Sequence, residues 1–409
     1  MNYMIRKYIL LLIPVILFSC EKSSVKNEYI LKYYGDAYED IGLSVDNTDN
    51  GYVITGQLTE IRRDVPNYIS SSSKKMAFIR TDLNGNRITK TSLGGRLNSV
   101  GSKVITNDNG MIITAGYVID SVTLQKDIYI VELNSDGETV KEKIYKADGN
   151  QYANDIISTS EGYMILGTTD VKRDNATDYM GNAAGKKDIL LIRISKALEM
   201  ITPPQPIGFV GNDEGLVIKQ DIDGRLIVVG TTDMSDKPAE GQAGTNVFVL
   251  NASTGEISII GGSRNETASD FEILDNGYLI AGSIGNEGID QVGHIWKLSR
   301  NINADPVEKS VDINGDQTAD VTYSVKAMCR YKTNTFLLAG QHGTGLSARM
   351  LIFAIDGDGN LVGDWIKKFG GTGTQSVNDV ISDSEGNVIA IGRNSYENNS
   401  MITFLKFRF

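Results

Sequence analysis

The residues best spaced for chemistry lie in one acidic stretch of the C-terminal half. Asp312, Asn314, Asp316 and Asp320 place side-chain oxygens at positions one, three, five and nine of segment 312–320. Ca²⁺ is a hard cation that needs several oxygen ligands around a tight loop. These four side chains are therefore candidate calcium ligands, and Ca²⁺ is the one cofactor that the sequence suggests.

The same spacing resembles the calcium loops of integrin-type propellers. The sequence departs from that pattern at Gln317, where the family carries a glycine that allows the bend. Tyr323 occupies the twelfth position, which excludes an EF-hand, because an EF-hand loop ends in glutamate. The alternative is structural: Asp320 aligns with an aspartate that recurs before other apolar strands, and we expect that aspartate to cap a turn.

Two histidines, His294 and His342, could serve as acids, bases or ligands. His294 begins an apolar strand, and His342 lies in the glycine-rich loop 341–345. No partner motif accompanies His342, so the alternative is a polar loop residue. The chain carries no nucleophile elbow, P-loop or dinucleotide fingerprint, and the sialidase Asp-box is absent. We therefore expect a protein that is not an enzyme.

An internal repeat sets the elements that must position these residues. A short apolar run closed by glycine recurs seven times, with closing glycines 51 to 63 residues apart. The copies are 51–56, 110–116, 162–167, 224–230, 277–282, 334–340 and 386–392. This period suits a four-stranded propeller blade with its loops.

Each copy has the same neighbours, which we name strands a to d, the repeated run being strand b. Strand a is often opened by aspartate, as at Asp40, Asp155, Asp270 and Asp379. Strands b and c are almost continuously apolar, which indicates burial on both faces. The pattern resembles bacterial seven-bladed propellers with D-x-hydrophobic and G-G-Y-hydrophobic-hydrophobic-x-G blades, and it covers residues 28–409. The fold class is therefore all-β, a seven-bladed propeller of four-stranded antiparallel blades.

The chain ends predict how the ring closes. Residues 28–35 resemble the d-type strand 365–370, whereas residues 401–407 are a c-type strand. The last blade therefore lacks an outer strand, and the first segment is a spare one. Pairing the two would satisfy an open sheet edge.

The long loops predict which side of the disc binds a ligand. In this meander the b–c and d–a connections share one face, and the large insertions, 57–75, 168–187 and 231–245, are b–c loops. Variable loops on a rigid scaffold usually carry recognition, and tyrosine offers contact area at a small ordering cost. The candidate ligand-binding residues are Arg62, Tyr68, Arg173, Tyr179 and His342.

The N-terminus resembles a bacterial lipoprotein signal. Arg6 and Lys7 precede an apolar run, residues 8–18, that is too short to span a bilayer. The run ends in the lipobox-like sequence 17–20, although Phe18 is bulkier than the usual residue. The resemblance implies a signal peptide at 1–19, lipidation of Cys20 and a tether at 20–27, which the propeller predicted from the repeat follows at 28–409. Residue 21 is not the aspartate that retains lipoproteins in the inner membrane, so it also implies the outer membrane, on the cell surface or the periplasmic side.

The net charge limits the classes of binding partner, and the cysteine content bears on disulfide bonds. The net charge of −11 argues against nucleic acid and against anionic lipid, so membrane contact is expected only through the lipid anchor. Cys329, the only other cysteine, lies in an apolar run and is expected to be buried and unpaired.

These features lead to an expected function. We expect a binding or scaffold lipoprotein of the bacterial envelope, a monomer or a subunit of an outer-membrane complex that could serve nutrient uptake. Its partner would be a small molecule, a glycan or an envelope protein. The alternatives are an envelope assembly protein and a hydrolase or lyase acting at the central opening, because propellers host many activities.

Overall fold

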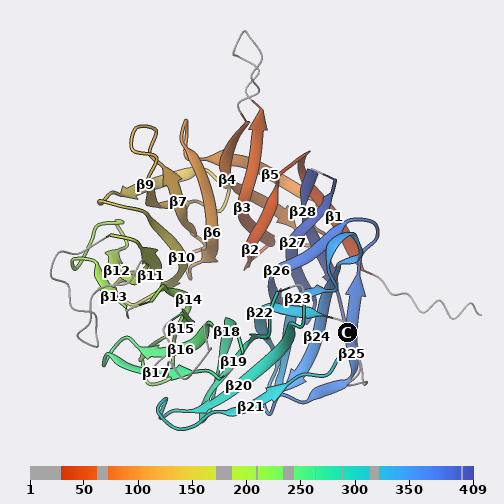
Figure 1. Cartoon of the computed structure of the whole chain (residues 1–409). Coiled ribbons are helices and arrows are strands. Elements are labelled where there is room, and N and C mark those ends of the chain that lie inside the picture. The colour runs from red at the N-terminus through yellow and green to blue at the C-terminus, as the bar shows by residue number, and fades with distance from the viewer. Residues whose placement is uncertain are drawn as a thin grey trace, which may run out of the picture.

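The computed structural model describes residues 29–61, 72–171, 187–208, 211–233, 244–262, 264–287, 289–313, 322–397 and 399–409. In these ranges the chain forms seven four-stranded antiparallel sheets. Figure 1 shows the sheets arranged radially around a central axis. The protein is a seven-bladed β-propeller, which confirms the prediction from the repeat.

The first four blades follow one another along the chain. Blade 1 holds β2 (Ile41–Thr48), β3 (Gly51–Ile61), β4 (Ser72–Asp82) and β5 (Arg87–Leu93). Blade 2 holds β6 (Asn98–Thr106), β7 (Ile112–Ile119), β8 (Lys126–Leu133) and β9 (Thr139–Tyr145). Blade 3 holds β10 (Gln151–Ser158), β11 (Gly162–Thr169), β12 (Asp188–Ser195) and β13 (Gln205–Ile207). Blade 4 holds β14 (Asp213–Gln220), β15 (Leu226–Thr232), β16 (Asn246–Asn251) and β17 (Glu256–Ile260).

The remaining three blades end in the pairing of the first described strand with the last one. Blade 5 holds β18 (Glu266–Leu274), β19 (Gly277–Ile284), β20 (Val292–Ser299) and β21 (Val307–Ser310). Blade 6 holds β22 (Tyr323–Lys332), β23 (Thr335–His342), β24 (Arg349–Asp356) and β25 (Leu361–Phe369), with the 3₁₀ turn η1 (Gly345–Ser347) between β23 and β24. Blade 7 holds β26 (Thr374–Ser382), β27 (Val388–Tyr396), β28 (Asn399–Phe407) and β1 (Ile30–Tyr38).

Blade 7 closes the ring as the chain ends predict. β1 pairs antiparallel with β28, with Ile30 opposite Lys406 and Tyr34 opposite Ile402. The buried Tyr34 hydroxyl donates a 2.6 Å hydrogen bond to the carbonyl of Gly85 in blade 1. The first strand therefore completes the last blade and contacts the next one.

The core lies between neighbouring blades. All residues of β11 are buried, whereas the first four residues of the outer strand β9 are exposed. One apolar cluster joins Ile113 and Ile130 of blade 2 to Ile156 and Ile165 of blade 3. Each middle strand buries both faces because a blade lies on either side of it, which explains the continuous apolar runs.

The closing glycine of each repeat allows two backbones to meet. A Cβ on Gly116 would lie 1.9 Å from the carbonyl oxygen of Val100, and one on Gly392 would lie 1.9 Å from that of Ser376. These carbonyls belong to the inner strands β6 and β26. A side chain at either glycine would force the inner strand away from strand b.

The connections follow the predicted distribution, with one correction. The longest b–c connections belong to blades 1, 3 and 4, between β3 and β4, β11 and β12, and β15 and β16. In blade 1 the strands extend to Ile61 and resume at Ser72, so the loop predicted at 57–75 is shorter than expected. Among the described residues, no helix is long and apolar enough to cross a membrane.

Candidate functional site

A bulge shapes the inner strand of every blade. The pairing register between strands a and b shifts at the same place in all seven blades, for example between Ala153 and Asp155 and between Val377 and Asp379. The residues that follow the shift are Ser44, Lys103, Asp155, Val217, Asp270, Ala327 and Asp379. A bulge re-aims side chains, and these seven residues line a central cavity of about 340 Å³.

Three aspartates of this ring join neighbouring blades. Asp155 accepts hydrogen bonds from the backbone N–H of Ile156 and, across the blade boundary, from that of Ile218. Asp270 accepts the N–H of Phe271 in blade 5 and that of Met328 in blade 6. Asp379 accepts the N–H of Val380 in blade 7 and that of Val45 in blade 1.

The repeat predicts that these aspartates open strand a and cap a turn. For Asp155, Asp270 and Asp379 this is wrong, because they lie inside β10, β18 and β26 and bridge two blades. Asp40 does directly precede β2, and in blade 6 the residue after the register shift is Ala327.

Lysines balance the carboxylates of the central cavity. The Lys103 ammonium lies 3.8 Å from Asp379, and Asp379, followed by Asp155 and Asp270, raises the pKa of Lys103. Lys219 lies 3.2 Å from Asp270 and 2.9 Å from Glu272. These groups satisfy one another and the backbone, so they hold the blades together and leave little capacity for acid–base chemistry.

Cys329 adds no reactive centre to this cavity. Cys329 lines the central cavity and is half-buried, whereas the sequence predicts a fully buried side chain. Burial raises the pKa of its thiol. A raised pKa keeps the thiol protonated and unreactive. Among the described residues, no group of three or more histidines, cysteines, aspartates or glutamates could hold a metal ion.

A tyrosine pair lies on the b–c/d–a side of blades 2 and 3. The rings of Tyr117 and Tyr152 are 6.4 Å apart, and the Lys126 ammonium lies 4.5 Å and 5.2 Å from their centroids. The Tyr152 hydroxyl donates to Glu214 at 3.0 Å. Because Lys126 covers the rings, the pair is not an open aromatic platform.

His342 lines a cavity of about 600 Å³ on the predicted binding face. The b–c loop of blade 6 and the start of the next d–a loop form its walls, which consist of Thr322, His342, Gly343, Thr344, Ser347, Arg349, Lys368 and Gly370. Arg349 stands opposite His342 across the β23–β24 hairpin. None of these lining residues is acidic. We call this the His342 cavity.

The electrostatics of the His342 cavity favour a negatively charged guest. The Lys368 ammonium lies 2.9 Å from Nε2 of His342. Burial lowers the pKa of His342, and Lys368 lowers it further; burial also lowers the pKa of Lys368. A neutral His342 can accept a hydrogen bond from Lys368, and an anion bound beside them would raise the pKa of both side chains.

The structure describes only two of the predicted site residues. Cys20, Arg62, Tyr68, Arg173, Tyr179, Asn314, Asp316 and Asp320 lie outside the described residues. Asp312 is exposed between the buried residues Val311 and Ile313. The calcium site therefore stays a prediction. Arg349 and Lys368 were not among the candidates, although a hairpin register drawn through the 341–345 loop would have placed Arg349 opposite His342.

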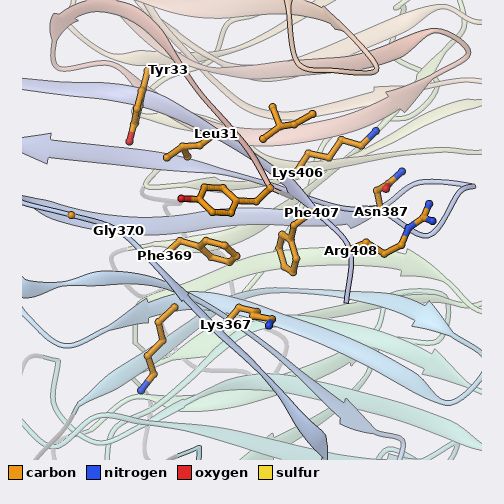
Figure 2. A pocket seen from close by; sticks show the side chains of 13 residues that line it. Leu31, Tyr33, Lys367, Phe369, Gly370, Asn387, Lys406, Phe407 and Arg408 are labelled. Carbon is orange, nitrogen blue, oxygen red and sulfur yellow. The ribbon is translucent and has the colours of Figure 1, made fainter. Parts of the chain in front are cut away.

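A second cavity, of about 1070 Å³, lies where blades 6 and 7 meet at the outer rim. Figure 2 shows Lys367 and Phe369 on one side of it and Leu31, Tyr33, Lys406 and Phe407 on the other. It shares the lining residues Lys368 and Gly370 with the His342 cavity, so the two cavities lie next to each other. We call it the seam groove.

An aromatic array forms the wall of the seam groove. The ring centroid of Phe369 lies 5.5 Å from that of Tyr29 and 5.0 Å from that of Phe407. Phe407 leads on to Phe409, which stacks on Trp365 at 5.1 Å. Such ring pairs add to the stability gained from buried area alone, so the array ties Tyr29 and the C-terminal residues Phe407 and Phe409 to blade 6.

Comparison with known proteins supports the fold but identifies neither a family nor an activity. No protein-family model matches the sequence, and no curated protein matches it. Puromycin hydrolase is 11% identical over 88% of this chain and 51% of its own, with a TM-score of 0.52.

Two further solved structures are more distant in shape. The Trypanosoma rangeli sialidase in complex with the inhibitor DANA is 10% identical over 79% of this chain and 56% of its own, with a TM-score of 0.44. The acylaminoacyl peptidase of Pyrococcus horikoshii is 12% identical over 90% and 51%, with a TM-score of 0.47. The chain spans about half the length of these three proteins, and at this identity the likeness concerns the fold alone.

Proposed function

We propose that this protein is a non-catalytic binding lipoprotein of the bacterial envelope that holds a small anionic ligand in the His342 cavity. The observation that carries the proposal is the convergence of Arg349, Lys368 and His342 on one cavity whose described lining holds no acidic residue. Such a cluster runs against the net charge of −11. Carboxylates and phosphates fit it, because arginine donates two parallel hydrogen bonds to such groups.

The geometry favours binding over catalysis. His342 already contacts the Lys368 ammonium, so its free electron pair is engaged. The central opening, where a hydrolase or lyase would act, holds aspartates that accept backbone hydrogen bonds across the blade boundaries. A role in envelope assembly, with a protein carboxylate as the guest, remains the alternative use of the same cavity.

The lipid anchor belongs to this proposal. The lipobox-like sequence ending at Cys20 supports lipidation and placement at the outer membrane, on the cell surface or the periplasmic side. An anchored propeller with an anion site suits the capture of acidic glycans or of a small anionic nutrient for an uptake complex. Ca²⁺, with oxygen ligands from Asp312, Asn314, Asp316 and Asp320, is the one cofactor that belongs to the proposal.

Replacement of Arg349 by alanine tests the proposal. The probes are galacturonate and inorganic phosphate, and the measurement is the heat of binding. We expect Arg349→Ala to weaken binding by about 2 kcal/mol, or roughly thirtyfold, because a charge-assisted hydrogen bond is lost. Arg193→Ala, on β12 of blade 3, is the control and should bind as the wild type does. Absence of heat with both probes, or equal affinity in the Arg349 variant, contradicts the proposal.

A further inference from the structure

Exposed aromatic side chains gather on one blade. Among the described residues, the exposed aromatics are four tyrosines: Tyr29, Tyr33, Tyr38 and Tyr396, which are 51%, 44%, 40% and 51% exposed. Tyr29 directly precedes β1, Tyr33 and Tyr38 lie on β1, and Tyr396 ends β27, so all four belong to blade 7. Elsewhere in the described ring, the large exposed hydrophobic side chains are aliphatic residues and one methionine, Met200. Tyr29 and Tyr33 line the seam groove, whereas Tyr38 and Tyr396 lie at the other end of β28, near Ser400 and Asn399.

Positive charge lies beside these tyrosines. The seam groove is lined by Lys367, Lys368, Lys406 and Arg408, and none of its described lining residues is acidic. Lys406 is paired with Asp383 at 3.5 Å, so the net charge rests mainly with Lys367 and Arg408. Figure 2 shows Lys367 and Arg408 on the same groove as Tyr33. The seam groove at the edge of blade 7 is thus basic and aromatic on an acidic protein.

The chain reaches this rim directly from its proposed anchor. Eight residues, 21–28, separate Cys20 from Tyr29. Even fully extended, a segment of that length spans only about 30 Å. If Cys20 carries lipid, the rim that begins at Tyr29 therefore stays within about one membrane thickness of the bilayer.

We propose that the rim of blade 7, defined by Tyr29, Tyr33 and the basic residues of the seam groove, docks on the headgroups of an anionic lipid bilayer. The inference deepens the proposed function, since it rests on the anchor at Cys20. Tyrosine prefers the membrane–water interface, where its ring is apolar and its hydroxyl is solvated. Lysine and arginine are attracted to anionic headgroups. The net charge of the whole protein predicts no contact with anionic lipid. A bilayer, however, interacts with the side chains of the surface that faces it, and at this rim those side chains are basic.

A tryptophan at position 33 tests the docking surface. Tyr33→Trp and Ile201→Trp, at equally exposed positions on blades 7 and 3 (44% and 43%), are compared in the full lipidated protein. Each is reconstituted in phosphatidylcholine vesicles with or without phosphatidylglycerol and with a headgroup-quenching lipid. Both variants keep the native tryptophans Trp296 and Trp365, so a difference in quenching between the variants comes from the added tryptophan. We expect quenching of the added tryptophan at 33 only, and only with phosphatidylglycerol. Lys367→Ala should reduce docking about fivefold.

The outcomes separate docking from anchoring. Equal quenching of the two variants, with Cys20 acylated by mass spectrometry, overturns the docking surface and keeps the anchor. If Cys20 carries no lipid, the same protein is mixed with both vesicles. If the protein then floats with the anionic vesicles alone, the docking surface is supported and lipidation of Cys20 is contradicted. If it floats with neither kind of vesicle, both hypotheses are contradicted. Loss of quenching on addition of inorganic phosphate assigns the groove to a soluble anion and also overturns the inference.

Discussion

Single side chains hold the blades of this propeller together at the central axis. The carboxylates of Asp155, Asp270 and Asp379 each accept a backbone N–H from the following blade, at 2.9 to 3.0 Å. Buried hydrogen bonds to a charged group contribute more to stability than neutral ones. Asp379 bridges blade 7 to blade 1 and therefore acts at the closure of the ring.

His294 makes stability depend on pH. It lies buried on β20 beside Trp296, at a ring distance of 4.7 Å, and burial lowers its pKa to about 4. The unfolded histidine titrates at about 6.5. Since the folded pKa is the lower one, the stabilisation is complete above the unfolded pKa and is lost as the pH falls from about 6.5 to 4.

We therefore expect the free energy of unfolding to fall by about 2 kcal/mol between about pH 7 and pH 5 from this residue alone. Urea unfolding at both pH values checks this, with His294→Gln as the reference that lacks the contribution. An NMR titration gives the pKa directly. A folded pKa near 6.5, or equal pH slopes in the two proteins, contradicts the assignment.

At the scale of elements, one strand decides whether the ring is closed. β1 supplies the outer edge of blade 7, packs Tyr34 against blade 1 and sets Tyr29 on Phe369 of blade 6. Its removal would expose the edge of β28 and open the aromatic array. No other blade depends on a strand so distant along the chain.

Deletion of residues 28–35 should therefore abolish cooperative unfolding. Circular dichroism during thermal melting measures this, and we expect a broad, early transition in place of a single step. Deletion of residues 21–27 is the matched control, because that segment precedes β1 and its loss should leave the melting curve unchanged. A sharp transition at the wild-type temperature in the 28–35 deletion rules out β1 as the closing element.

Elements were easier to predict than the bulges within them. The apolar runs and their closing glycines located strand b of every blade, because burial on both faces leaves a continuous apolar signal. The inner-strand bulge leaves no such signal, since one extra residue changes the spacing of a short strand only slightly. Asp40 was therefore grouped with Asp155 and Asp270, although Ser44 occupies the equivalent position in blade 1.

At the scale of the whole molecule, charge is distributed unevenly. The net charge is −11, yet basic side chains collect in the His342 cavity and along the seam groove, which share Lys368. The two sites lie on neighbouring sides of blades 6 and 7. Docking of the rim would hold the His342 cavity beside the bilayer, where an uptake complex could receive the ligand.

The attachment of the whole molecule to the membrane follows from one residue. Cys20→Ser should leave the folded propeller intact, since the described fold begins after this position, and should release the protein from the membrane fraction. Fractionation and immunoblotting of cells that produce each form measure the distribution. Ser19→Ala keeps the cysteine and should remain with the membrane. Equal membrane retention of the Cys20 variant excludes lipidation as the anchor.

The sequence by itself determined the blade number, the four-strand plan, the closing strand and the side with the long loops. These depend on local patterns, namely apolar runs, turn residues and the spacing of repeats. The tertiary structure alone decided which distant side chains meet. His342 and Arg349 face each other across a hairpin, Lys368 comes from the outer strand, and the seam groove joins residues from both ends of the chain. Closure of a ring brings together segments whose separation along the chain carries no pattern, so only the folded backbone places them.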